Sequence, residues 1–159
     1  MSISDLIVVM NQGVVQQIGP PQQVYDSPVN LFVAKFLGTP PINVFDGCIR
    51  GGQLFLGDNK IAAIQGAHDQ PVYAAIRPEG LTPDEHGPLV CTLGRVEVMG
   101  RDTSVIAAHG ACAAGTLRAI ISAENRVDPS REVVRFAVKP SKLFLFDRQT
   151  QNRIAFAIQ

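Results

Sequence analysis

Aromatic residues and net charge are both scarce in this chain. Its 159 residues contain no tryptophan and only 6% aromatic residues, and 14 Lys and Arg balance 14 Asp and Glu. Proteins that bind nucleic acid usually carry a basic excess, and single-stranded bases stack on aromatic side chains. The composition therefore argues against nucleic acid as a partner.

Cysteine pairs and long apolar runs are also missing. Cys48, Cys91 and Cys112 are odd in number and far apart, so neither a metal site nor a disulfide framework is expected, and we predict buried, reduced thiols. No apolar run reaches the length of a transmembrane helix. Any connection with a membrane is therefore expected to run through a partner protein.

Residue patterns typical of catalysis are absent as well. His68, His86 and His109 stand alone and are predicted to be surface or loop residues. No serine lies in a G-x-S-x-G turn, and no G-x-x-x-x-G-K-[ST] loop is present to hold phosphates. We therefore predict no catalytic, cofactor-binding or metal-binding residue, and expect that this chain alone neither binds nor hydrolyses ATP.

The first 42 residues resemble a piece of a larger structure. Leu6–Met10 and Val14–Ile18 flank the turn Asn11-Gln12-Gly13 and predict a β-hairpin. An unbroken apolar strand normally needs cover on both faces. Nothing nearby in the sequence supplies that cover.

Two short helices are predicted next, the first over Gln22–Asp26. Ser27 is the predicted N-cap of the second, Pro28 its first residue and Gly38 its C-cap. The second helix would carry an apolar stripe that either packs on the chain's own sheet or binds a partner. The stripe comprises Val29, Phe32, Val33, Phe36 and Leu37.

From Asn43 onward the sequence reads as short strands separated by turns. Gly51-Gly52 predicts a tight hairpin, and the longest candidate strand, Leu89–Met99, changes phase at Gly94, which predicts a β-bulge. Ile154, Phe156 and Ile158 alternate in a last strand that runs to the end of the chain. We predict a mainly β fold: an OB-type Greek-key barrel with extra hairpins, preceded by a β-hairpin and one or two short helices.

One turn follows a strongly apolar strand, in the sequence Ile76-Arg77-Pro78-Glu79-Gly80-Leu81. Pro78 lacks an amide hydrogen and should end the strand. The simplest interpretation is a solvated ion pair between Arg77 and Glu79 across the turn. The other arginines are likewise expected on the outer face of the strands, where a basic patch could take an oxyanion or an acidic partner.

Four stretches resemble one protein family. "IRPEGL" is similar to the Ile-Arg-Pro-Glu-x-Leu signature in the C-terminal regulatory domain of sugar-type ABC importer ATPases. Residues 5–43 are similar to the end of their nucleotide-binding domain, and "VKPSKLFLFDRQTQNRI" resembles their closing stretch. "GRVEVMGRDTSV" corresponds to a segment that usually reads Val-Glu-x-Leu-Gly-x-Glu-Thr, so Asp102 stands in place of Glu.

The resemblance implies a C-terminal fragment of such an ATPase. Residues 1–42 would be the end of the ATPase domain with its linker helices, and residues 43–159 an OB-like TOBE regulatory domain. ATP and magnesium would bind only in the missing domain. Motif positions with a structural or interface role would be Arg77, Pro78, Glu79, Gly100, Asp102, Pro140, Phe146 and Asp147.

The implied function is a non-catalytic regulatory and dimerisation domain for uptake of sugar-like solutes. Its expected partners are a second copy, membrane permease subunits and cytosolic regulators, and its expected location is the cytoplasmic face of the membrane. A β-domain that senses an oxyanion or sugar is the alternative, suggested by ten arginines and Gly-rich loops. An OB-type nucleic-acid binder is a third possibility, disfavoured by the composition.

Overall fold

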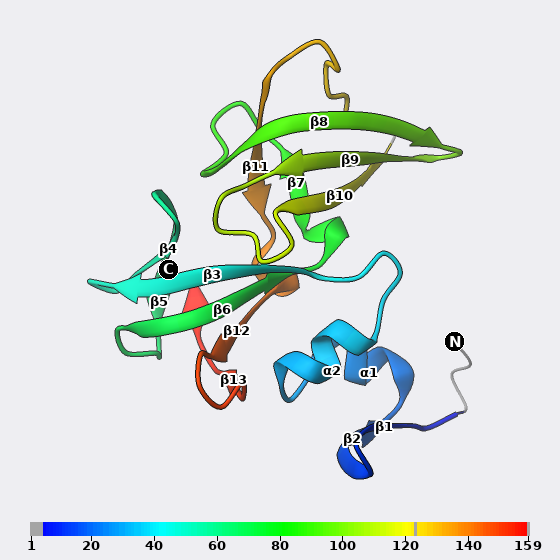
Figure 1. Ribbon diagram of the computed structural model, residues 1–159, viewed down its shortest axis with the longest axis vertical. Helices are drawn as coiled ribbons and strands as arrows, with labels where there is room; N and C mark the ends of the chain where they lie inside the picture. The colour runs from blue at the N-terminus through cyan, green and yellow to red at the C-terminus, as the bar shows by residue number, and fades with distance from the viewer. Residues whose placement is uncertain (1–4, 123, 159) are drawn as a thin grey trace.

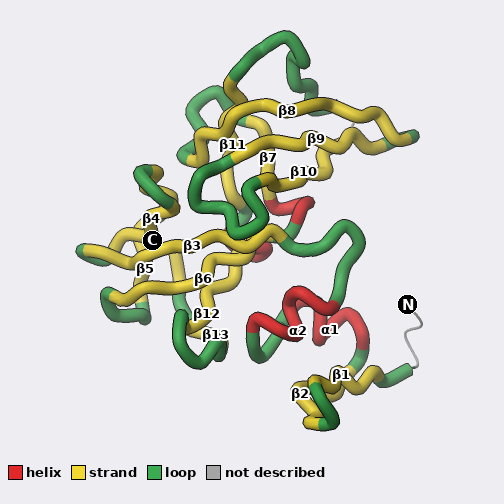
Figure 2. Tube along the Cα trace, in the orientation of Figure 1, coloured by secondary structure: helices red, strands yellow, loops and turns green. Residues whose placement is uncertain are grey.

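The computed structural model describes residues 5–122 and 124–158, with a small N-terminal part on one side of a β-rich body (Figure 1). The N-terminal part comprises the strands β1 (Ile7–Asn11) and β2 (Val14–Gly19) and the helices α1 (Pro21–Asp26) and α2 (Leu31–Phe36). Figure 2 shows strands throughout the rest, interrupted by two single helical turns, η1 (Pro78–Gly80) and η2 (Pro140–Lys142). The prediction of a hairpin and two short helices before a mainly β body is confirmed.

The larger sheet is antiparallel, with the strand order β13-β12-β6-β3-β4-β5-β14. The chain end closes it almost completely, because β13 pairs with β12 at one edge and β14 pairs with β5 at the other. The expectation of a single last strand is therefore wrong: Ala155 and Phe156 carry the chain from one edge to the other. The strands are β3 (Asn43–Arg50), β4 (Gln53–Leu56), β5 (Asn59–Gln65), β6 (Gln70–Ile76), β12 (Leu143–Asp147), β13 (Arg153–Ile154) and β14 (Ala157–Ile158).

A second antiparallel sheet has the order β10-β9-β8-β11-β7. The predicted bulge is confirmed in β8: the register with β9 shifts between Leu93 and Arg95. A Cβ on Gly94 would lie 2.9 Å from the Ile106 carbonyl oxygen, so a glycine is needed at the bend. The strands are β7 (Leu81–Pro83), β8 (Leu89–Met99), β9 (Asp102–Ala108), β10 (Thr116–Ser122) and β11 (Val133–Val138).

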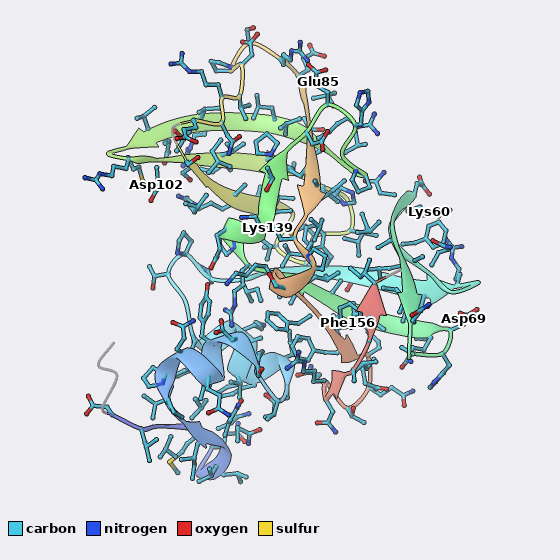
Figure 3. The ribbon with its side chains drawn as sticks, turned by 180° about the vertical axis from the view of Figure 1, so that it is seen from behind. Lys60, Asp69, Glu85, Asp102, Lys139 and Phe156 are labelled. Atoms are coloured by element: carbon cyan, nitrogen blue, oxygen red, sulfur yellow. The ribbon has the colours of Figure 1, made fainter. Side chains whose placement is uncertain are left out.

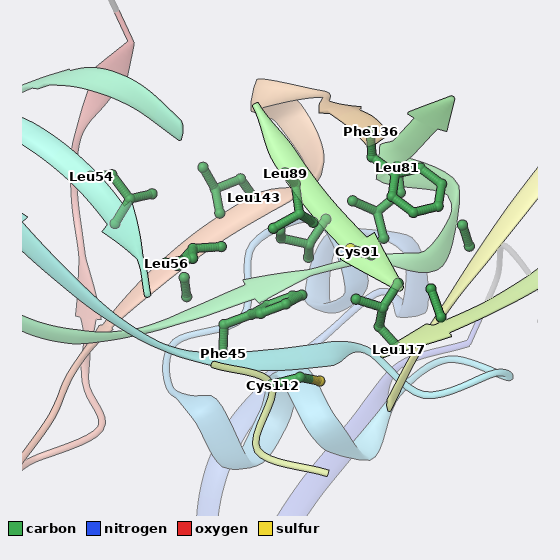
Figure 4. Packing of buried hydrophobic residues seen from close by; sticks show 14 of the residues in the cluster. Phe45, Leu54, Leu56, Leu81, Leu89, Cys91, Cys112, Leu117, Phe136 and Leu143 are labelled. Atoms are coloured by element: carbon green, nitrogen blue, oxygen red, sulfur yellow. The ribbon is translucent and has the colours of Figure 1, made fainter. Parts of the chain in front are cut away.

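Both sheets contribute to one apolar core, shown in Figure 4. Phe45 and Leu56 come from the first sheet, and Leu89 and Phe136 from the second; all four are fully buried. Because this single cluster joins the two sheets, the β body packs as a barrel-type unit, as the sequence predicts.

The cysteines agree with the prediction of buried, reduced thiols. Cys91 and Cys112 are buried, Cys48 is half-buried, and all three are free. Burial raises the pKa of the Cys91 thiol to about 12, so this group is an uncharged apolar filler of the core at neutral pH.

Helix α2 begins three residues later than predicted. Ser27 follows the end of α1, and the N-cap of α2 is Asn30, whose side chain accepts a hydrogen bond from the Val33 amide. The predicted stripe is confirmed at Val33, which is buried against the hairpin, and is wrong at Val29 and Phe36, which are 44% and 60% exposed. Leu31 and Ala34, which lie outside the predicted stripe, pack on the barrel.

One face of the hairpin is apolar and exposed. Val8 is paired with Ile18 and Met10 with Val15, so these four side chains share a face, and each is 49% to 59% exposed. On the opposite face Val9 is buried against α1 and α2. Helices α1 and α2 therefore cover one face of the hairpin, and the expectation that nearby sequence supplies no cover is confirmed for the other face only, among the described residues.

Candidate functional site

Four of the predicted motif positions meet where the helices join the barrel. Arg77, Pro78 and Glu79 form the exit from β6, and Pro140 begins the helical turn beside them. The two turns are tied together, because the Arg77 amide donates to the Lys142 carbonyl at 3.1 Å and the Lys139 amide donates to the Gly80 carbonyl at 2.8 Å. The turn after β6 is therefore part of the barrel framework.

Arg77 is the largest fully buried side chain of this junction and is only 1% exposed. Its Nη1 donates to the carbonyls of Ala34 and Leu37, at 3.0 and 2.7 Å, and its Nη2 donates to the carbonyl of Tyr25 at 2.9 Å. These three carbonyls lie at or near the C-terminal ends of α1 and α2. Arg77 thus joins both linker helices to the barrel through their backbones.

The expected solvated ion pair between Arg77 and Glu79 is not formed. Among the described residues Arg77 has no carboxylate partner, and its charge faces three backbone dipoles and the ring of Tyr25, whose centroid is 3.9 Å away. Burial is the main cause that lowers the pKa of Arg77. Helix C-termini carry partial negative charge, which explains how a guanidinium can be buried here.

Glu79 contacts a different set of groups. The Tyr25 hydroxyl donates a short hydrogen bond to Glu79, and the Lys142 ammonium lies 3.9 Å from the same carboxylate oxygen. Burial, followed by this hydrogen bond to Glu79, raises the pKa of Tyr25 to about 12. We call Tyr25, Arg77, Glu79, Lys142 and the two helix-end carbonyls of Ala34 and Leu37 the junction cluster.

A shallow groove of about 490 Å³ runs beside the junction cluster. Asp102 lines it from the start of β9, where Figure 3 labels it, and Glu79 lines it from the junction. Gly100 lies in the preceding turn with φ +65°, and the space around its missing Cβ is open. Asp102 shares this groove with Glu79 but forms no side-chain hydrogen bond or ion pair within the described part of the chain.

Phe146 and Asp147 lie away from the junction cluster. Phe146 is fully buried and packs with Leu31 and Ala34 of α2, which makes it part of the contact between helix and barrel. Asp147 accepts hydrogen bonds from the amides of Gln149 and Thr150, which lower its carboxyl pKa and fix the turn after β12. Neither residue faces a reactive group.

Among the described residues no serine or cysteine side chain is hydrogen-bonded to a histidine. The described residues contain no group of three His, Cys, Asp or Glu side chains placed to hold a metal ion. His68 and His86 are exposed, as predicted, whereas His109 is half-buried and its imidazole bonds Asn59. Over the same described ranges, no helix has the length and apolar character needed to cross a bilayer.

Sequence reasoning did not find Tyr25, Lys142 or the helix-end carbonyls as partners of the motif. Tyr25 stands 52 residues before Arg77, and backbone carbonyls carry no residue signature. The available signal was the run Ile76-Arg77-Pro78, because an arginine directly after four apolar strand residues is placed close to the interior. Its partners depend on how the linker folds back, which composition and periodicity do not specify.

The chain is similar to known ATP-binding proteins, although it matches no protein-family model. It is 32% identical over 157 residues to an sn-glycerol-3-phosphate import ATP-binding protein of Jannaschia sp., covering 97% of this chain and 43% of the relative. The corresponding protein of Chromobacterium violaceum is 34% identical over 99% of this chain and 44% of its own length.

A third relative has a different stated solute. The sulfoquinovosyl glycerol transport ATP-binding protein of Agrobacterium fabrum is 33% identical over 97% of this chain and 45% of its own length. The chain therefore spans less than half the length of these relatives, while almost all of it is matched.

Proposed function

This chain belongs with the ATP-binding subunits of sn-glycerol-3-phosphate and sugar importers of the ABC type, and we propose that it is their non-catalytic regulatory and dimerisation region. Residues 1–42 would connect it to a nucleotide-binding region, and residues 43–159 would be the regulatory barrel. The imported solute would be sugar-like. ATP and magnesium would bind only outside this chain.

The exposed hairpin face is the main observation that supports this proposal. Val8, Met10, Val15 and Ile18 form an apolar surface on a two-stranded sheet, and isolated two-stranded sheets are marginally stable in water. The relatives are more than twice as long as the matched segment. A region within that additional length would cover this face, and the hairpin would complete a larger sheet.

The proposed partners follow from the same assignment. The complete subunit would work with membrane permease components at the cytoplasmic face of the membrane, and the barrel would offer a surface for cytosolic regulators. A pair of barrels would keep two ATP-binding regions at high effective concentration while they open and close.

Sedimentation velocity over a roughly hundredfold range of protein concentration tests the dimerisation role. We expect a reversible dimer. The double variant Val8→Asp with Ile18→Asp separates this dimer from non-specific association of the exposed hairpin, and it should still dimerise because the barrel is unchanged. A monomer at every concentration, or a dimer lost in the double variant, would contradict a barrel-mediated role.

Arg77 and Arg148 give little support to the alternative, an oxyanion- or sugar-sensing domain. Arg77 donates to three carbonyls, and Arg148 donates to those of Gly47 and Val72 and pairs with Asp46. These guanidinium groups are already engaged. Thermal unfolding in the presence of molybdate, sulfate, phosphate and simple sugars tests it, because a specific ligand would raise the unfolding temperature with concentration.

A further inference from the structure

The side-chain contact between the linker and the barrel is apolar. Leu31, Ala34 and Ile42 pack on Ala75, Phe144 and Phe146. Apolar burial is non-directional, so such a patch favours contact without selecting one position of the helix.

Directional contacts define where the linker lies. At the start of α2 the Leu31 amide donates to the Gln151 carbonyl, and the Arg153 amide donates to the Val29 carbonyl, both at 3.0 Å. These two bonds hold one end of α2 and leave the C-terminal ends of both helices to another contact.

Arg77 provides a directional contact at this place. Its planar guanidinium has donors in a fixed fork, and two nitrogens reach three carbonyls from two helix ends. The acceptors are backbone atoms, so the contact depends on where the linker backbone lies and not on which side chains the linker carries. The Tyr25 ring lies against the guanidinium and restricts it further.

The same contact contributes less to stability than its bond count suggests. Burial of the guanidinium has a desolvation cost, no carboxylate forms an ion pair with it, and the buried Nε has no hydrogen-bond partner among the described residues. In some proteins a buried ionic group of this kind specifies one arrangement without adding much to stability.

We propose that Arg77 fixes the position of the linker helices, residues 20–42, on the barrel. A displacement of the hairpin and helices is then transmitted directly to β6. This role concerns contacts within the present chain, and it holds whether or not the importer function assigned above is correct.

A substitution at Gly38 offers a second, independent way to disturb the contact of Arg77 with the linker. Its φ of +114° favours glycine, and a Cβ there would lie 3.3 Å from Arg77 Nη1 and 3.4 Å from the Tyr25 ring. Gly38→Ala therefore disturbs the linker side of the contact while the buried charge remains in place.

Hydrogen exchange measured by mass spectrometry on the complete chain tests the proposal. In Arg77→Met, amides of residues 20–42 should exchange at least about tenfold faster, while those of β3, β6 and β12 stay within about twofold of the wild type. Gly38→Ala should produce the same pattern. Arg148→Met is the matched control, because it removes carbonyl contacts inside the barrel only, and it should leave residues 20–42 unchanged.

Three results would overturn the proposal. Equal acceleration in the linker and in the barrel strands of Arg77→Met would make Arg77 an ordinary core residue. Unchanged exchange in residues 20–42 of both Arg77→Met and Gly38→Ala would show that the apolar patch and the backbone hydrogen bonds of Val29 and Leu31 position the linker without Arg77. Failure of Arg77→Met to fold would show that this side chain acts on stability and not on position.

Discussion

Arg77 is buried and His109 is half-buried. Each forms hydrogen bonds with groups that are distant in the sequence. Arg77 reaches the carbonyls of linker helices 40 to 52 residues earlier in the chain. His109 bonds Asn59 through Nε2 at 2.8 Å, and its Nδ1 accepts the Ala111 amide at 3.0 Å. The sequence showed only an isolated histidine and a charged turn, because the partners lie far away or belong to the backbone.

The His109 geometry predicts a loss of stability in mild acid. Nδ1 must remain unprotonated to accept the Ala111 amide, and burial lowers the imidazole pKa below its ordinary value of 6.5. The unfolded chain therefore binds the proton more readily. The stabilisation is complete above the ordinary pKa and is lost as the pH falls through the lower folded-state pKa.

Urea unfolding at about pH 7.5 and about pH 5.5 measures this effect. The wild type should lose more unfolding free energy between these two conditions than His109→Gln does. The exposed His86 offers a control, since His86→Gln should lose as much as the wild type. Equal losses in wild type and His109→Gln would show that His109 does not contribute.

At the scale of elements, turns, the bulge and the bounds of α1 followed the sequence closely, whereas the start of α2 did not. Gly51 and Gly52 both have positive φ in the β3–β4 turn, and Gly94 marks the bulge of β8. Such signals are local, because glycine tolerates backbone geometry that other residues avoid. Ser27 and Asn30 are both good N-caps, and tertiary packing decides between them.

The two N-cap candidates make a direct comparison. Asn30→Ala should lower the free energy of unfolding by about 1 kcal/mol, because the Val33 amide loses its acceptor. The same substitution also removes the hydrogen bond from Asn30 to Gln16 of the hairpin. Ser27→Ala should change stability by less than about 0.5 kcal/mol. Chemical denaturation of the two variants checks this, and a larger cost at Ser27 would contradict the observed cap.

Two glycine-to-alanine variants test whether the β8 bulge needs a glycine. Gly94→Ala should destabilise by about 1–3 kcal/mol, because its Cβ would press on the backbone of Ile106. Gly110→Ala is the control, since nothing lies within 4 Å of the added atom and its cost should be within about 0.5 kcal/mol. Thermal unfolding of both proteins distinguishes them. Equal midpoints would mean that the β8 bend does not need glycine.

At the scale of the whole molecule, the barrel class could be predicted, but its closure could not. Alternation and turn spacing indicated many short strands around one core, and the shared cluster of both sheets agrees. The division of residues 153–158 into two strands at opposite edges depends on pairing across the fold. The exposed hairpin face was predictable, because a continuous apolar strand needs cover on both faces and the two short helices after it cover only one.

In the proposed function the barrel is the region that makes contacts, and the exposed hairpin face is covered by another region of the subunit. Hydrogen exchange of the chain at low and at high protein concentration tests this most directly. Self-association should slow exchange within the barrel, residues 43–158, and leave β1 and β2 unchanged. Protection that appears only over β1 and β2, or no concentration dependence anywhere, would contradict it.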